Sequence, residues 1–239
     1  MLKMDEIDSR VYDSHIISQG LEFQVDKYYE PKERPMARRV SIVLQAINPK
    51  PQEKILDVGC GVGTFAFHCA KFKALAFGVD YSKESIKVAK ELTKRYYVES
   101  HARFLVSDAT RLPFKDSSFD KIVSADFIEH INLEDKNRLI TEMLRVLKPQ
   151  GGIVIFTPNL IREKIGALYW RFRHLLFRDK IPKTDLHFGL IDRRGFERLL
   201  KKNRLTFIFS YQDITRPYLA HLPFLRKFLS LNLLWVIKR

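Results

Sequence analysis

Short apolar runs alternate with segments of helical spacing through the middle of the chain. The apolar runs predict buried strands, which cover 54–59, 74–80, 102–108, 119–126 and 152–159. Between them, apolar residues that recur every three or four positions predict helices over 64–72, 82–96 and 133–148. Strands that alternate with helices favour a parallel sheet covered on both faces.

Local signals refine these boundaries. Ser82 is a plausible N-cap for the second of these helices. Pro149 and the Gly151–Gly152 pair predict a turn before the last strand. Upstream, residues 1–30 predict a polar, partly helical arm, and Pro35 opens a helix predicted over 36–47.

The pattern changes after Pro158. The elements predicted beyond it are a long helix over 160–180, a short helix over 195–203, strands over 204–214 and 233–239, and a helical stretch over 217–229. One side of the long helix carries an apolar stripe, which we expect to pack on the body of the protein. The residues of this stripe are Ile161, Ile165, Leu168, Phe172, Leu175 and Leu176.

The segment KILDVGCGVGT (54–64) places glycine at every second position after a predicted strand. A strand, a glycine-rich turn and a helix together bring the backbone close to a ligand at the carboxyl edge of a sheet. Glycine also permits a positive φ, and the free N–H groups at the start of a helix can meet an anion. The dinucleotide-binding pattern is G-x-G-x-x-G, so Thr64 after Gly63 disfavours a dehydrogenase.

Aspartates end the next two predicted strands. Asp80 can accept hydrogen bonds from both hydroxyls of a ribose, and its alternative role is that of an acid at a helix start. Asp108, followed by Ala109, can read an adenine edge, or it can be an ordinary turn residue.

Composition and charge suit a basic globular protein. The chain has 239 residues, 46% of them apolar, which suits one large domain or one domain with a small lid. Residues 162–239 carry 18 Lys and Arg against 6 Asp and Glu, so most of the net charge of +14 lies there. This asymmetry favours an anionic partner, namely nucleic acid, a membrane surface or a phosphorylated substrate, although a solvated basic face is the plainer interpretation.

The sequence also bears on the compartment. Only two cysteines are present, so we expect no disulfide framework and a reducing intracellular compartment. The first residues, MLKMDEIDSRVYDS, lack the apolar stretch of a signal peptide, and the run over 228–237 is too short to span a bilayer. We therefore expect a cytoplasmic protein.

Five motifs in register resemble the class I S-adenosylmethionine-dependent methyltransferase family. They are KILDVGCGVG, GVDYS, LVSDATRLPFKDSSFDKIVSAD, FIEHI and MLRVLKPQGGIVIFTPN, and they cover about residues 40–160. The resemblance implies an α/β fold with a doubly wound, mostly parallel seven-stranded sheet whose last strand is antiparallel. It implies S-adenosylmethionine as cofactor and S-adenosylhomocysteine as product.

The resemblance also implies which residues hold the cofactor. Asp80 would hold the ribose hydroxyls, Tyr81 would pack by the adenine, and Asp108 and Ala109 would meet the adenine. The residues implied for the methionine part and the turn around it are Asp57, Gly59, Gly61, Gly63, Ser124 and Ala125.

The same resemblance organises the chain as one methyltransferase domain over 1–239. Its expected parts are a helical N-terminal arm (1–50), the cofactor-binding core (51–160), a basic amphipathic lid inserted after the fifth strand (161–203) and the last two strands (204–239). In this family the arm and the lid commonly roof the substrate cleft.

Two histidines are candidates for a catalytic base, which methyl transfer needs mainly when the acceptor is a hydroxyl. His130 follows the fourth predicted strand and His187 follows the long helix, and each can instead be a structural residue. No cluster of His, Cys, Asp and Glu has the spacing of metal ligands, so we expect no metal site.

The expected acceptor is a small apolar or lipid-associated molecule, with O-methylation favoured. Residues 160–180 combine apolar and basic faces, which predicts a peripheral contact with an anionic membrane, at its inner face. The rival hypothesis is an RNA methyltransferase whose basic C-terminal third holds phosphates. The segment SADFIEH after the fourth strand lacks an N-P-P-Y-type motif, which argues against methylation of a base amine. A cofactor-binding scaffold without activity is a further alternative.

Overall fold

A computed structural model of the chain describes residues 9–178, 189–214, 218 and 221–239. Within these residues seven strands form one sheet in the order β3-β2-β1-β4-β5-β7-β6. The strands are β1 (Lys54–Val58), β2 (Leu75–Asp80), β3 (Ala102–Val106), β4 (Phe119–Ala125), β5 (Leu147–Pro158), β6 (Thr206–Ile214) and β7 (Ser230–Lys238). Strand β7 runs antiparallel to both its neighbours, and the remaining pairs are parallel. The predicted fold class is confirmed.

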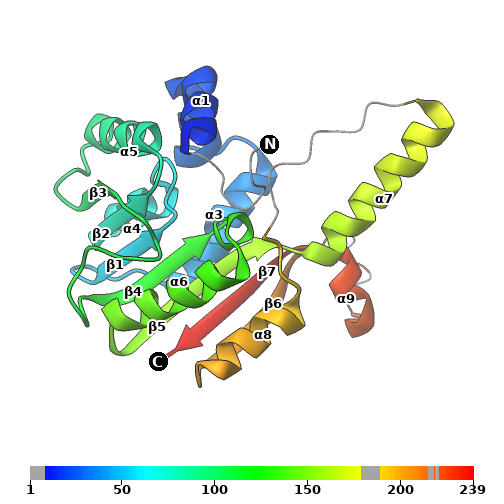
Figure 1. Ribbon diagram of the computed structural model, residues 1–239. Helices are drawn as coiled ribbons and strands as arrows, with labels where there is room; N and C mark the ends of the chain where they lie inside the picture. The colour runs from blue at the N-terminus through cyan, green and yellow to red at the C-terminus, as the bar shows by residue number, and fades with distance from the viewer. Residues whose placement is uncertain (1–8, 179–188, 215–217, 219–220) are drawn as a thin grey trace.

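Helices cover both faces of the sheet (Figure 1). One core lies under α3 (Arg34–Ile47), α4 (Thr64–Lys71) and α5 (Lys83–Arg95). The other lies under α6 (Leu133–Val146) and α8 (Arg193–Lys202), where Phe196 packs edge-on against the fully buried Trp235 at 4.7 Å. Burial of the central strands β1 and β4 on both faces explains why their sequences are largely apolar runs.

The structure differs from the predicted elements at β5. The segment with Pro149 and Gly151–Gly152 was expected to turn, yet β5 begins at Leu147 and continues through it. The register with β4 shifts between Phe119 and Lys121, and Gln150 has a φ of 67°. The residues that cannot pair with β4 therefore lie in a β-bulge, and β5 continues beyond it.

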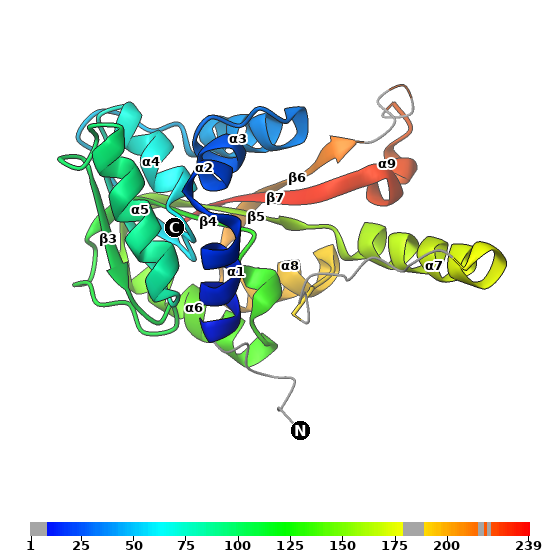
Figure 2. The same ribbon diagram turned by 90° about the horizontal axis from the view of Figure 1, so that it is seen from above.

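The long helix after β5 also differs from expectation. Helix α7 (Leu160–Phe177) projects away from the body in both views of the ribbon (Figures 1 and 2), and none of its residues is buried. The expectation that its apolar stripe packs on the body is therefore wrong. The chain leaves the sheet edge at Pro158, Asn159 caps α7, and α9 (Pro223–Leu229) is the element that packs beside it.

The N-terminal arm folds back onto the carboxyl edge of the sheet. It comprises α1 (Ser9–Gln19), α2 (Leu21–Gln24) and a π-helical turn (Val25–Tyr29) before α3. The Tyr29 hydroxyl donates a 2.7 Å hydrogen bond to the carbonyl of Val62 in the glycine-rich loop. Asp13 on α1 accepts hydrogen bonds from the Ser82 hydroxyl and the Glu84 amide, at the start of α5. The arm is thereby attached to the two loops that follow β1 and β2.

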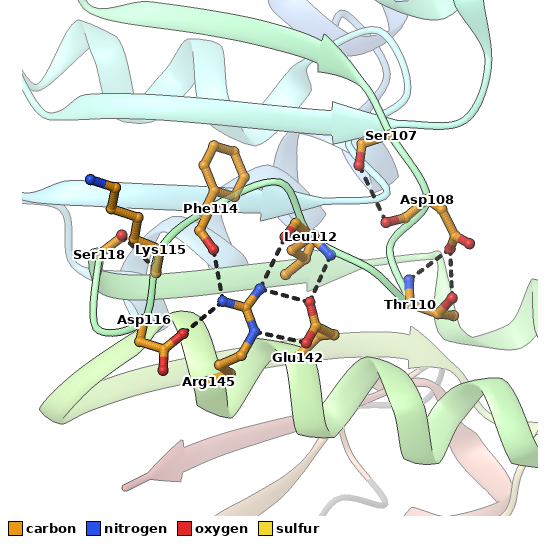
Figure 3. Close-up of polar contacts among 10 residues, drawn as sticks. All are labelled: Ser107, Asp108, Thr110, Leu112, Phe114, Lys115, Asp116, Ser118, Glu142 and Arg145. Atoms are coloured by element: carbon orange, nitrogen blue, oxygen red, sulfur yellow. Dashed lines mark hydrogen bonds and ion pairs between the residues drawn. The ribbon is translucent and has the colours of Figure 1, made fainter.

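The loop between β3 and β4 is held by one arginine of α6 (Figure 3). Arg145 donates hydrogen bonds to the carbonyls of Leu112 and Phe114, each within 2.9 Å, and pairs with the carboxylates of Asp116 and Glu142. Glu142 in turn accepts a 2.7 Å hydrogen bond from the Leu112 amide. A planar guanidinium with five donors suits such a loop, because it satisfies several carbonyls at once.

We predict that Arg145→Ala destabilises the fold by about 2 kcal/mol, because the loop carbonyls and Glu142 lose charge-assisted hydrogen bonds. Urea denaturation measures this change. Arg138→Ala on the same helix is the matched control, since its side chain is 58% exposed and its pairs with Glu134 and Asp135 should contribute less than about 0.5 kcal/mol. Equal effects of the two substitutions would contradict the role of Arg145.

Candidate functional site

The glycine-rich turn after β1 has the conformation that its sequence predicts. Gly59, Gly61 and Gly63 have φ values of 72°, 51° and 86°. A Cβ on Gly59 would lie 2.2 Å from the ring of Phe127, and one on Gly63 would lie 2.6 Å from that of Phe104. A Cβ on Gly61 would meet nothing within 4 Å. Gly59 and Gly63 are thus required by packing, whereas Gly61 faces open space where a ligand can approach the backbone.

Asp80 connects this turn to the end of β2. Its two carboxylate oxygens accept hydrogen bonds from the amides of Gly61, at 2.8 Å, and Ser82, at 2.9 Å. Burial raises the pKa of Asp80, and the amides act against this shift. Ser82 caps α5 as predicted, because its hydroxyl accepts from the Ser85 amide. Tyr81 is 63% exposed beside this junction.

Asp57 lies beneath the same turn. Its carboxylate is buried and accepts a 3.1 Å hydrogen bond from the amide of Ala66, in the first turn of α4. Burial raises the pKa of Asp57 to about 7, and the nearby charge of Asp80 adds to the effect. The geometry gives Asp57 a positioning role, since its side chain holds the start of α4 against β1.

The pair predicted to meet the adenine lies at the end of β3. Asp108 is exposed, and one of its oxygens accepts hydrogen bonds from the amide and the hydroxyl of Thr110, at 2.7 and 2.8 Å (Figure 3). Ala109 is buried in the core. Asp108 therefore shapes its own turn, and its second oxygen remains available to a ligand.

Buried polar atoms without partners gather beyond β4. Among the described residues, six buried side-chain N and O atoms make no hydrogen bond, and four of them belong to this one region. These four atoms are Arg39 Nε, Ser124 Oγ, Asp126 Oδ1 and Glu129 Oε1. A buried polar atom without a partner is costly, so such a concentration indicates where a ligand completes the site.

Opposite charges meet in this region. Arg39 on α3 forms an ion pair with Asp126, which has a φ of 52° just after β4. Its guanidinium also lies over the ring of Phe156, 5.5 Å from the centroid. Burial lowers the pKa of Arg39, and the charge of Glu129 acts against this shift. Ser124 is 1% exposed and Ala125 is 9% exposed beside this pair.

Glu129 is a residue that the sequence analysis passed over. It is 1% exposed, and one of its carboxylate oxygens accepts a 2.9 Å hydrogen bond from the hydroxyl of Thr157 at the end of β5. Burial raises the pKa of Glu129 to about 7. The buried Lys136 is nearby, with a pKa lowered to about 8 by burial. The signal was present in the sequence, because a glutamate within an apolar segment after a strand is unusual.

The structure describes one of the two candidate histidines. His130 is half-buried, directly after Glu129, and its amide donates to the carbonyl of Phe127. His187 lies outside the described residues. Within the described part of the chain, no three His, Cys, Asp or Glu side chains form a cluster that could hold a metal ion. Cys60 and Cys69 are both buried as free thiols.

Residues 56–155 match the family described as "Methyltransferase domain". They form a class I S-adenosylmethionine-dependent methyltransferase domain. The predicted family and its cofactor, S-adenosylmethionine, are thereby confirmed for this part of the chain. The matched residues include the glycine turn, Asp80, Asp108 and the region beyond β4.

Curated relatives of the methyltransferase domain methylate different acceptors, as their names state. The chain is 38% identical over 109 residues to norajmaline N-methyltransferase from Rauvolfia serpentina, covering 45% of this chain and 37% of that protein. It is 37% identical over 139 residues to the chloroplastic tocopherol O-methyltransferase from Arabidopsis thaliana, covering 56% of this chain and 38% of that protein. The chain therefore spans less than two fifths of the length of either relative.

A solved structure extends the likeness to the whole fold. The [4+2]-cyclase SpnF superposes with a TM-score of 0.69 at 15% identity, over 98% of this chain and 97% of that one. Its name describes a cyclase, so this shared fold by itself does not fix the reaction.

We predict that Asp57→Asn flattens the pH dependence of stability. In the folded protein Asp57 keeps its proton up to about pH 7, whereas an ordinary aspartate loses it near 3.8. Between these values the unfolded chain loses a proton that the folded chain retains, so the contribution of this group to stability is largest below 3.8 and is lost as pH rises to about 7.

Denaturant titrations across this pH window measure the effect. The free energy of unfolding should fall less steeply with pH in Asp57→Asn than in the unmodified protein. Glu99→Gln removes an exposed carboxyl and should leave the slope unchanged. An unaltered slope in Asp57→Asn would show that the buried carboxyl is already ionised.

Proposed function

We propose that the protein transfers the methyl group of S-adenosylmethionine to a small apolar or lipid-associated acceptor, with oxygen favoured as the acceptor atom. The observation that carries this proposal is the group of unpartnered buried polar atoms beside the glycine turn. The glycine turn lies at the carboxyl end of β1 and the polar atoms lie at the carboxyl end of β4, between which the strand order reverses. Open α/β sheets bind ligands at this position.

The ribose and adenine would lie over β2 and β3. Each oxygen of Asp80 accepts one amide and keeps a lone pair for a ribose hydroxyl. Gly61 leaves room for the ligand, and Tyr81 offers an exposed ring for the adenine. Asp108 and Ala109 would border the adenine from the end of β3.

The methionine part would lie over β4, where its two charges match the protein. We assign Arg39 to the carboxylate and Asp126 to the ammonium, since this half-buried ion pair has an unpartnered buried nitrogen and an unpartnered buried oxygen. The Ser124 hydroxyl is a further donor without a partner. The packing of Phe127 on Gly59 joins this region to the turn, and Asp57 and Gly63 hold the turn in shape.

The reaction needs positioning more than it needs chemistry from side chains. The bound cofactor supplies an activated methyl group on a sulfonium. An acceptor hydroxyl held in line with this carbon would form a C–O bond as the C–S bond breaks, and it would have to give its proton to a base. We assign this proton to Oε1 of Glu129, which has no partner in the described structure, while Thr157 holds the other oxygen. Its pKa of about 7 suits a base at neutral pH.

His130 and His187 stay candidates for the same role. His130 adjoins Glu129 in sequence, so single substitutions of Glu129 and His130 are compared in the same assay. We favour oxygen as the acceptor atom because of this buried base. A hydroxyl acceptor depends on a base more strongly than an amine does.

We predict that Arg39→Gln weakens binding of S-adenosylhomocysteine about 10- to 100-fold, because the cofactor carboxylate loses a charged partner. Isothermal titration calorimetry measures this change. Arg38→Gln is the matched control, since Arg38 precedes it on α3, is 62% exposed and pairs with Asp213 instead. Asp80→Asn should also weaken binding. Wild-type affinity in Arg39→Gln would remove Arg39 from the site.

We predict that methyl-labelled S-adenosylmethionine, incubated with the protein and a cell extract, places label in the lipid or apolar small-molecule fraction. Glu129→Gln should keep cofactor affinity but lower turnover at least about tenfold, whereas His130→Gln should lower it less. Label in the RNA fraction would support the RNA hypothesis instead. Absence of transfer to any fraction, with cofactor bound, would favour a scaffold.

A further inference from the structure

Helix α7 presents an apolar face that nothing in the described structure covers. Its side chains include Leu168, Phe172 and Leu175, which are 68%, 59% and 79% exposed. At 3.6 residues per turn, the apolar residues of this face fall within an arc of about 120°. The residues of the arc are Ile161, Ile165, Leu168, Tyr169, Phe172, Leu175 and Leu176.

Helix α9 also exposes apolar side chains. It packs beside α7 at the same end of the molecule (Figures 1 and 2) and has no buried residue. Its Phe224 and Phe228 are 64% and 39% exposed. Exposed apolar side chains on two adjacent helices are characteristic of a surface that contacts another phase or molecule.

Basic residues border the apolar arc on both sides. Lys164 and Arg171 follow one edge of the helix, and Arg162 and Arg173 follow the other. Arg178 adds a positive charge at the C-cap. Glu163 is the one acidic residue of α7. Arg226 and Lys227 add two more positive charges on α9. An apolar face between two basic borders is the arrangement of a helix that lies in the plane of a membrane interface.

The side chains of the α7 face favour a lipid bilayer over RNA or a second copy of the chain as the binding partner. Five of the seven residues of the arc are aliphatic and cannot stack on nucleobases, which leaves only Tyr169 and Phe172 of the arc for that contact, so the face is poorly suited to single-stranded RNA. A self-associating face would place these basic borders against each other, which is unfavourable. Anionic headgroups satisfy the borders while acyl chains receive the apolar side chains. Within the described residues, no helix is both long enough and apolar enough to cross a bilayer, so the contact would be a surface one.

We propose that α7 and α9 together form a docking surface for an anionic lipid bilayer. The surface would insert the side chains of the arc and of Phe224 and Phe228 among the lipids, with the basic borders at headgroup level. This inference deepens the proposed function, because it names the bilayer as the source of the acceptor. The docking itself is measured without methyl transfer, so the two proposals fail separately.

Vesicle co-sedimentation of the full chain tests the proposal. We expect binding to vesicles of phosphatidylcholine and phosphatidylglycerol, and much weaker binding to phosphatidylcholine alone. The double substitution Leu168→Asn with Leu175→Asn should reduce binding at least about tenfold, because both side chains would leave the lipid. Tyr97→Asn removes an 88% exposed side chain away from this surface and should leave binding unchanged.

The basic borders are tested by a second pair of substitutions. Lys164→Gln with Arg171→Gln should weaken binding to the anionic vesicles about fivefold for each charge removed. The matched control is Lys73→Gln with Lys94→Gln, which removes two exposed charges elsewhere and should weaken binding less. Equal losses in the two pairs would show that general charge attraction, rather than this surface, carries the binding.

Two further results would overturn the proposal. One is unaltered co-sedimentation of the Leu168→Asn and Leu175→Asn variant. The other is a dimer in lipid-free sedimentation velocity that this variant dissociates, since the face would then bind a second copy of the chain. Calorimetry with S-adenosylhomocysteine accompanies each variant and should give wild-type affinity, because these residues lie outside the proposed cofactor site.

Discussion

The site depends on the contact between the backbone of the glycine turn and the carboxylate of Asp80. The amide of Gly61 can reach that carboxylate because the turn after β1 takes positive φ angles that glycine tolerates. The second oxygen of Asp80 accepts the Ser82 amide, and Ser82 in turn caps α5. One acidic side chain therefore fixes the relative position of two strand ends, a helix start and the open space above Gly61.

Burial without complete pairing distinguishes the neighbouring region beyond β4. A protein core normally pairs its polar atoms, yet Arg39, Ser124 and Asp126 each keep an unpartnered atom there. Such atoms raise the free energy of the folded chain until a ligand with matching donors and acceptors arrives. The zwitterionic end of an amino-acid-like cofactor provides both signs of charge. The stability of this part of the fold and its affinity for the cofactor are therefore linked.

The sequence predicted the sheet well because each of its central strands is an apolar run bounded by a turn residue or a helix. It also showed that the turn could take positive φ angles, because glycine permits them, and all three glycines have one. It failed at Pro149, where a bulge compensated for a residue that disfavours strands. It failed again for the stripe of α7, since helical periodicity shows that a face is apolar but not what covers it. The role of Arg39 could not be predicted from the sequence, because its ion-pair partner Asp126 is far away along the chain.

Hydrogen–deuterium exchange with and without S-adenosylhomocysteine tests the central claim most directly. The account predicts slower exchange at the amides of the glycine turn, the Asp80–Ser82 junction and the segment from Asp126 to His130. Exchange in α7 should stay unchanged, because that helix has no part in cofactor binding. Protection that omits the glycine turn and the segment beyond β4 would contradict the account, since the ligand would then occupy another part of the molecule.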